Sequence, residues 1–172
     1  MDLTPNLIVL WLGVLVGAIT DVQQGLIKNW LTFSLMAFGI VYHALVGPDR
    51  WFGLTGCATA FALHFVLYLL TIQKAGDAKL FMAIGACAGT REMLETSVWF
   101  AILYLPVGLL TLAVRGRLSN LIATIRWSIQ SAMGHPAAGE QPEPTMMIAG
   151  PTILVATLLA GSTDAVKGLL FG

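Results

Sequence analysis

Two aspartates, Asp21 and Asp77, stand at the edges of apolar segments in a chain in which charged residues make up only 10%. Two carboxyl groups within a few ångströms of each other cannot both ionise comfortably, and they tend to share a proton. One member of such a pair can activate water while the other protonates a leaving amine. If the fold brings Asp21 and Asp77 together, we expect acid–base chemistry at that point.

The local settings of the two aspartates differ, and structural roles compete with the chemical one. Asp77 precedes a short apolar segment, where aspartate is a common N-cap and the positive helix end favours the carboxylate. Asp21 ends an apolar segment, where the carbonyl groups of a helix terminus favour the protonated acid. The sequence therefore suggests an ionised Asp77 and a protonated Asp21, although a coupled pair titrates as a unit.

The composition indicates what kind of protein positions these groups. Hydrophobic residues make up 57% of the 172 residues, and the mean hydropathy is +0.82. These values are typical of an integral membrane protein. The formal net charge is zero, so no basic surface indicates a nucleic acid as a partner. We expect an all-α, polytopic membrane protein in which residues 1–172 form a single domain.

Apolar runs divide the chain into about six expected transmembrane helices. They are expected at residues 4–21, 29–46, 52–73, 78–90, 94–114 and 146–163. The first run lacks a basic n-region and a small-residue cleavage site, so it is expected to be a retained helix. Residues 115–145 are the long polar loop, and the apolar spacing within 121–133 predicts an interfacial amphipathic helix there.

The distribution of basic residues predicts the orientation in the membrane, because cytoplasmic loops retain Lys and Arg. One side holds Lys28, Lys74, Lys79, Arg115, Arg117 and Arg126, and the other holds Arg50, Arg91 and Lys167. This asymmetry places the N-terminus outside and the loop of residues 115–145 in the cytoplasm. Asp21 and Asp77 then share the cytoplasmic edge of the membrane.

Two stretches around these aspartates resemble the signatures of the type IV prepilin peptidase family. "DVQQGLIKNWLT" resembles the first signature, with matches at Asp21, Ile27, Asn29 and Leu31. "KAGDAKLFMAIGA" resembles the second signature, Gly-x-Gly-Asp-x-Lys-Leu, with matches at Gly76, Asp77, Lys79, Leu80 and Gly85. The resemblance extends over about residues 5–163.

The chain departs from the family pattern at a few positions. Lys28 stands where the family usually has proline, and Lys74 stands where it has the first glycine of Gly-x-Gly-Asp. Gln23 and Gln24 replace a commonly basic turn. The chain also has no cysteine-rich insertion, so it resembles the short, peptidase-only Tad-type branch without N-methyltransferase activity.

The resemblance implies an aspartic endopeptidase of the Gly-x-Gly-Asp type that needs no cofactor. Its substrates would be type IV prepilins or pseudopilins, cut at the cytoplasmic face of a bacterial inner membrane. Asp21 and Asp77 would be catalytic, and Gly76 would leave room for the substrate backbone. Lys79 would orient a carboxylate or carbonyl, or else anchor the helix at the lipid interface. Asn29 is expected to cap the second helix.

Other readings of the chain stay open beside this one. A proton-coupled transporter would use buried histidines in a relay, for which His43 and His64 are candidates. A catalytically silent pilus or secretion assembly factor would accommodate the departures at Lys28 and Lys74. His43, His64 and His135 lack metal-ligand spacing, so no metal is expected. Small residues form two close-packing patterns, Gly13-x-x-x-Gly17 and Gly85-x-x-x-Gly89, and Cys57 and Cys87 are expected as small buried residues.

Overall fold

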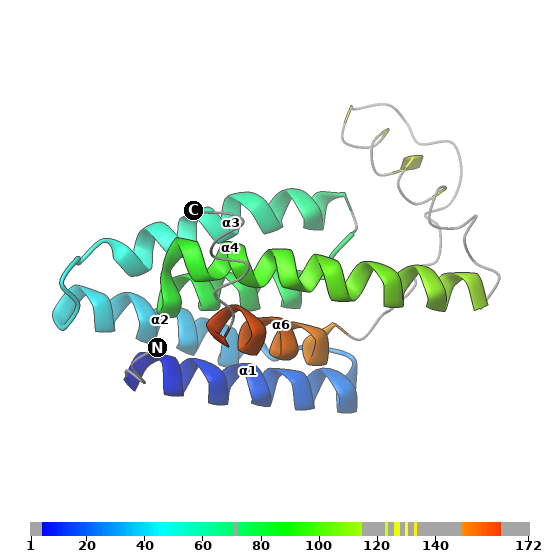
Figure 1. Cartoon of the computed structure of the whole chain (residues 1–172). Helices are drawn as coiled ribbons and strands as arrows, with labels where there is room; N and C mark the ends of the chain where they lie inside the picture. Colours follow the sequence, from blue (N-terminus) through cyan, green and yellow to red (C-terminus); the bar gives the residue numbers. More distant parts are fainter. Residues whose placement is uncertain are drawn as a thin grey trace.

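The computed structural model describes residues 5–70, 72–114 and 149–162, together with isolated positions between 123 and 133. In these ranges the regular structure is helical. The helices are α1 (Pro5–Gln24), α2 (Asn29–Leu45), α3 (Phe52–Leu69), α4 (Ala75–Val114) and α6 (Gly150–Ser162). They run alongside one another as a bundle (Figure 1). The all-α prediction is therefore confirmed, whereas the expected amphipathic helix at 121–133 lies outside the continuously described ranges.

Helix α4 is the centre of the bundle, and it consists of two arms. Gly89 has φ 85° and ψ 177°, a backbone conformation that is open essentially only to glycine. The arms fold back alongside each other, because the Phe81 ring of the first arm meets the Phe100 ring of the second at 5.3 Å. Helix α4 also packs against α1, α2, α3 and α6. The separate segments expected at 78–90 and 94–114 correspond to these two arms.

The expectation of about six membrane spans needs correction. Two helices, α1 and α3, are long and apolar enough to cross a bilayer, while α2 and Gly150–Gly161 are shorter apolar helices. At 1.5 Å per residue, a helix of 13 residues such as α6 extends only about 20 Å, less than the roughly 30 Å of hydrocarbon. The first arm of α4 is similarly short and carries Asp77 and Lys79. By helix length and composition alone, two membrane spans are supported, α1 and α3.

Apolar side chains cover both the inside and much of the outside of the bundle. The first arm of α4 is the most enclosed element, with fully buried residues such as Leu80, Phe81 and Ile84. The surrounding helices instead expose large apolar side chains. Examples are Leu12 on α1, Trp30, Phe33 and Leu45 on α2, and Phe61, Val66 and Leu69 on α3. An exposed apolar surface of this extent marks contact with lipid or with another protein.

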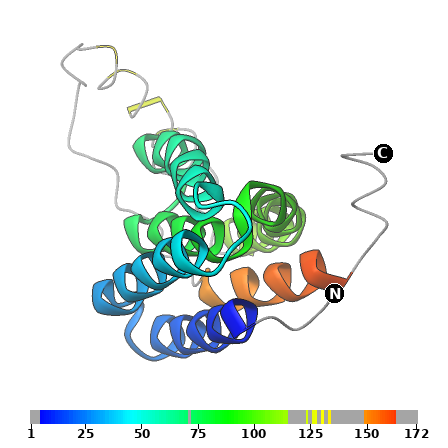
Figure 2. The same ribbon diagram turned by 90° about the vertical axis from the view of Figure 1, so that its left-hand side faces the viewer.

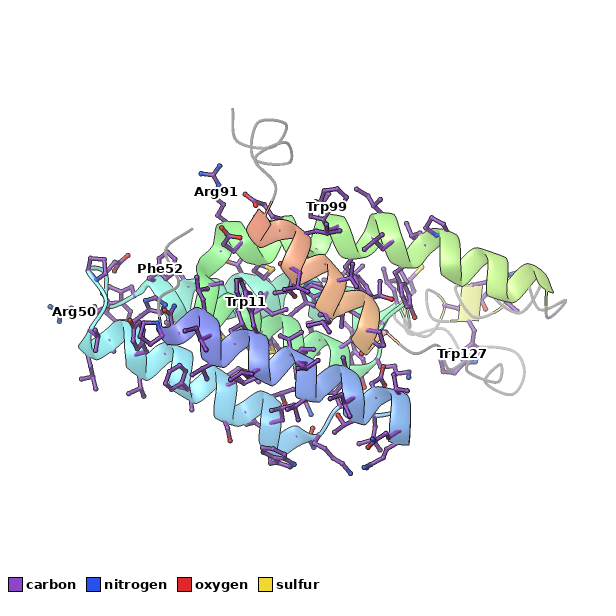
Figure 3. The ribbon with its side chains drawn as sticks, turned by 60° about the horizontal axis from the view of Figure 1, so that its bottom comes forward. Trp11, Arg50, Phe52, Arg91, Trp99 and Trp127 are labelled. Carbon is purple, nitrogen blue, oxygen red and sulfur yellow. The ribbon has the colours of Figure 1, made fainter. Side chains whose placement is uncertain are left out.

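We call the end of the bundle at which α4 reverses the hairpin end, and two polar side chains, Asn6 and His43, are buried there. Asn6 Nδ2 donates a hydrogen bond to the carbonyl of Cys87 at 2.8 Å, and His43 Nε2 lies 2.9 Å from the same oxygen. The two side chains thus satisfy a carbonyl that lies two residues before the break at Gly89. Arg50, Phe52 and Arg91 lie toward this end (Figure 3).

The small residues singled out in the sequence are buried, and they have mixed partners. Cys57 and Cys87 are both buried and free, as expected. A Cβ on Gly17 would be in ordinary contact with Leu80 of α4, which agrees with the predicted approach of α1 and α4. Gly85, however, packs against Gly56 of α3. The second pattern therefore brings α4 onto α3 and not onto the helix that carries Asp21.

Candidate active site

Asp21 lies inside the last part of α1, and its side chain is fully buried. Helix α1 continues to Gln24, and Gly25 ends it with φ 67° while donating its N–H to the Asp21 carbonyl at 2.8 Å. The prediction that Asp21 ends the helix was therefore wrong by about one turn. The three residues after Asp21, Val22 to Gln24, continue the helix, and Gly25 ends it.

The Asp21 carboxyl group meets the N-terminus of α6. The backbone N–H groups of Ala149 and Gly150 donate hydrogen bonds to Asp21 Oδ2 at 2.9 and 2.8 Å. These donors and the positive end of a helix stabilise an ionised carboxylate. Figure 2 shows α6, in orange, lying between α1 and α4. No local pattern in the sequence connects Asp21 to residues so distant in the chain.

Gly150 allows this close approach. A Cβ atom at position 150 would lie 2.9 Å from both the Cα of Ala18 and the Cβ of Asp21. Real Cβ atoms essentially never come so close to backbone atoms, so any larger residue would push α6 away from α1. The short contact between the two helices therefore depends on this glycine.

Asp77 is the third residue of α4, and it is 2% exposed. Its Oδ2 accepts the backbone N–H of Lys74 at 3.3 Å, and the Lys74 carbonyl accepts the N–H of Ala78 at 3.1 Å. Lys74 thus occupies the N-cap position, and Asp77 reaches back to it as the acidic member of a capping box does. The alternative reading of Asp77 as the N-cap is therefore wrong.

Lys74 connects the two aspartates. Its Nζ lies 3.8 Å from Asp21 Oδ1 and donates to the Gly25 carbonyl at 3.4 Å, while its backbone binds Asp77. Asp21 Oδ1 is buried and, among the described residues, has no hydrogen-bond partner. One oxygen of Asp21 is therefore held by α6, and the other faces the lysine and the second aspartate.

The electrostatic setting of Asp77 is opposite to the one expected from its place at a helix start. Burial raises the pKa of Asp77, and the nearby Asp21 carboxylate raises it further, against smaller lowering effects from the Lys74 amide and ammonium. Asp21 instead has two amide donors and a cation. The raised pKa favours a protonated Asp77, because burial outweighs the effect of the local helix end.

Two further groups at this site were not identified as site residues in the sequence. The buried His64 holds the loop before Asp77, with Nδ1 2.8 Å from Gln73 Oε1 and Nε2 3.0 Å from Ser97 Oγ. Its ring stacks on Phe81 at 3.9 Å. Tyr104, on the second arm of α4, lies within electrostatic range of Asp21 and Asp77. Neither side chain belongs to a local motif, so only the fold relates them to the aspartates.

The remaining predicted site residues lie near the aspartates but have other contacts. Lys79 Nζ donates to Asn29 Oδ1 at 2.9 Å and lies 5.3 Å from the centre of the Phe33 ring. Asn29 is the first residue of α2 and does not cap it, since Lys28 occupies the N-cap position. A Cβ on Gly76 would meet Ile27 at 3.4 Å. These three residues thus join the two signature segments to each other.

Comparison with known proteins assigns the chain to a family. A sequence model described as "Type IV leader peptidase family" matches residues 7–114. A prepilin peptidase, EppA, from Methanothermobacter thermautotrophicus is 37% identical over 71 residues, covering 38% of this chain and 18% of that protein. A preflagellin peptidase from Methanocaldococcus jannaschii is 30% identical over 87 residues, covering 47% of this chain and 37% of that protein.

These matches span well under half the length of either relative, and no solved structure matches the chain. The family match nevertheless covers more than half of the chain, and it includes both signature segments with Asp21 and Asp77. The resemblance to prepilin peptidases that the two signatures indicated is thereby confirmed. The chain belongs to the type IV leader peptidase family.

Proposed function

We propose that this protein is an aspartic endopeptidase that removes the leader of a type IV prepilin-like protein. The observation that carries the proposal is the juxtaposition of Asp21 and Asp77, two buried carboxyl groups from different helices that share Lys74 as a neighbour. The two relatives are named for prepilin and preflagellin processing, which supports the same substrate class. Both relatives come from archaea, so they do not support a bacterial location, and the bacterial inner membrane is part of the proposal.

The contacts suggest a division of labour between the two aspartates. Asp21 is the general base, because its carboxylate is stabilised by α6 while Oδ1 is free of hydrogen bonds within the described residues. Asp77 is the general acid, because burial and Asp21 raise its pKa. A water molecule between the two loses a proton to Asp21 and attacks the scissile carbonyl carbon, while Asp77 protonates the carbonyl oxygen. The protonated Asp21 then delivers its proton to the leaving amine as the C–N bond breaks, and the Asp77 carboxylate takes back a proton from a hydroxyl group of the intermediate, which becomes the new carboxyl group.

The apolar exterior supports a site at a membrane edge. The helices around α4 expose large apolar side chains, and α1 and α3 are long enough to cross a bilayer. Asp21 and Asp77 lie at the opposite end of the bundle from the hairpin end, near the ends of α1 and α3. In the proposed topology this is the cytoplasmic edge, where the junction between a basic leader and a hydrophobic helix is accessible and water can enter.

A transporter relay has less support. Both ring nitrogens of His64 are taken up by Gln73 and Ser97, and His43 Nε2 lies against the Cys87 carbonyl, while His43 Nδ1 has no hydrogen-bond partner among the described residues. A relay needs histidines that can exchange protons along a path. These contacts instead fix the reversal of α4 and the loop before Asp77.

The proposal is tested by co-expression with candidate prepilins encoded in the same genome, followed by intact-mass measurement of each pilin. Loss of a short N-terminal leader is the expected result. An unchanged mass for every candidate would favour the silent assembly factor. The proposed peptidase-only activity also predicts that the new N-terminus carries no added methyl group, and a methylated product of the purified protein would contradict that part.

A further inference from the structure

Lys74 is the chain's own addition to the site, and we propose that it is a positioning residue that pairs with the Asp21 carboxyl group and ties it to the Asp77 segment. This inference rests on the proposed peptidase function and adds a residue that the family signature does not provide. The signature that this chain resembles has a glycine at position 74, which could supply neither a cation nor a long side chain.

Three contacts of Lys74 support this role. Its ammonium lies 3.8 Å from Asp21 Oδ1 and 3.4 Å from the Gly25 carbonyl, so it joins both the carboxylate and the turn that ends α1. Its backbone N–H donates to Asp77 Oδ2 at 3.3 Å. A single residue therefore touches both aspartates, through its side chain on one and its main chain on the other.

The ion pair is largely shielded from water. The Asp21 side chain is 1% exposed and that of Lys74 is 30% exposed. A pair with one buried member is screened less than a surface pair. The charge of Lys74 therefore acts strongly on Asp21, although its partial exposure moderates the effect.

The other groups that face Asp21 do not replace this cation. The described neighbours are the amides of Ala149 and Gly150 from α6, the Asp77 carboxyl from the first arm of α4, and the Tyr104 phenol within electrostatic range on the second arm. The amides hold Oδ2, whereas Oδ1 has Lys74 as its charged partner. Removing the ammonium leaves Oδ1 facing an acidic neighbour.

The first test is the pH profile of kcat/KM for prepilin cleavage in detergent or liposomes. Lys74→Met keeps the length of the side chain and removes the charge, so the acidic limb should move up by about one pH unit. Lys74→Arg should restore the profile of the unmodified protein. Lys28→Met is the matched control, since it removes the other lysine that departs from the family pattern, and its profile should be unchanged.

The second test does not depend on cleavage. A water-soluble carbodiimide should join Lys74 Nζ to the Asp21 carboxyl group as an amide, with loss of one water, because the two groups form an ion pair. Peptide mapping by mass spectrometry detects this crosslink, and Lys74→Arg should abolish it. A control reaction on Lys28→Met should give the crosslink at the normal yield.

The outcomes separate the inference from the function on which it rests. An unshifted acidic limb in Lys74→Met, or the absence of the crosslink, would overturn the role of Lys74. A shift that Lys74→Arg fails to restore would also overturn it, because the charge would then not be the cause. A crosslink in a protein that cleaves no prepilin at any pH would support the ion pair and refute the proposed function.

Discussion

The two ends of the bundle both bury polar side chains, but they do so in different ways. At the hairpin end, Asn6 and His43 are partners of one carbonyl, that of Cys87, which lies two residues before the break at Gly89. At the opposite end, Asp21 and Asp77 bring acidic groups together around Lys74. The first cluster hydrogen-bonds to the main chain near the break in α4, whereas the second brings together groups that can gain or lose protons.

This difference separates structural from chemical polar groups in an apolar protein. A buried polar group costs free energy unless it is hydrogen-bonded, and a buried charge costs much more. The hairpin end offsets part of this cost with hydrogen bonds to the main chain, although Asn6 Oδ1 and His43 Nδ1 have no hydrogen-bond partner among the described residues. The aspartate end leaves Asp21 Oδ1 without a hydrogen bond among the described residues, which is costly for stability but is what the proposed mechanism requires of a group that takes a proton from water.

The largest expected effect comes from neutralising the aspartate end. Asp21→Asn and Asp77→Asn should each lower prepilin cleavage by about a thousandfold, because an amide keeps the shape but cannot exchange the proton. The double variant should be scarcely worse than either single variant, since the residues act as a unit. Initial rates of leader removal, measured by mass spectrometry on equal amounts of folded protein, check both statements.

Asp49→Asn is the control for this pair, because Asp49 caps a turn at the hairpin end through a hydrogen bond to the N–H of Trp51, and asparagine keeps that acceptor. Its cleavage rate should stay within about twofold of the unmodified protein. Near-normal cleavage by either Asp21→Asn or Asp77→Asn would contradict the two-aspartate mechanism. Losses that multiply in the double variant would argue for independent roles.

The hairpin end should respond in stability and not in chemistry. Gly89→Ala forces a side chain into a conformation reserved for glycine and against the ring of Phe52, so we expect the free energy of unfolding to fall by about 3 kcal/mol. Thr90→Ala, at the next position, should change it by less than about 1 kcal/mol. Thermal unfolding in detergent measures both. A shifted pH profile of cleavage in Gly89→Ala would contradict the separation of the two ends.

A smaller effect is expected where α6 meets Asp21. Gly150→Ala places a Cβ 2.9 Å from Ala18 Cα and Asp21 Cβ, so α6 must move and lengthen its hydrogen bonds to the carboxylate. We expect cleavage to fall roughly tenfold, which corresponds to about 1.4 kcal/mol in the barrier. Val155→Ala, on the exposed side of the same helix, should have little effect. Equal losses in the two variants would show that α6 matters only for packing.

The smallest effect concerns stability against pH. The pKa of Asp77 is raised by burial and by Asp21, so the folded protein holds this proton where the unfolded chain has lost it. Stability should therefore be full below the ordinary range of an aspartate, at about pH 4, and should fall as the pH rises through the higher folded value. Asp77→Asn removes that loss, and its melting temperature should exceed that of the unmodified protein at pH 8 but not at pH 4. The opposite sign would mean that Asp77 is stabilised as a carboxylate.

Much of the helical architecture was predictable from apolar runs alone. The segments expected at 29–46 and 52–73 correspond to α2 and α3, and the expected segment 146–163 contains α6. Helix boundaries were less accurate, because the polar residues after Asp21 continue α1 to a glycine. The number of spans was overestimated, since an apolar helix enclosed by protein, like the first arm of α4, has the same composition as one that faces lipid.

The pairing of Asp21 with Asp77 was predictable from topology, but the partners that set their charge were not. The two amide donors of Asp21 come from residues 149 and 150, and main-chain donors leave no trace in residue types. Lys74 was visible only as a departure from a pattern. Its contact with Asp21 depends on the turn at Gly25 and the cap at the start of α4, which exist only in the folded chain.

The position of these amide donors gives the protein an order of biosynthesis. A ribosome makes Asp21, Lys74 and Asp77 long before residues 149 and 150, so both aspartates are present in the growing chain while Asp21 still lacks its two hydrogen-bond donors. The segment that matches the family ends at residue 114 and leaves this completing contact out. A chain whose translation has stalled before α6 would carry every signature residue and still be immature. The hydrogen bonds to Asp21 can therefore form only after the start of α6, the last described helix, has been made.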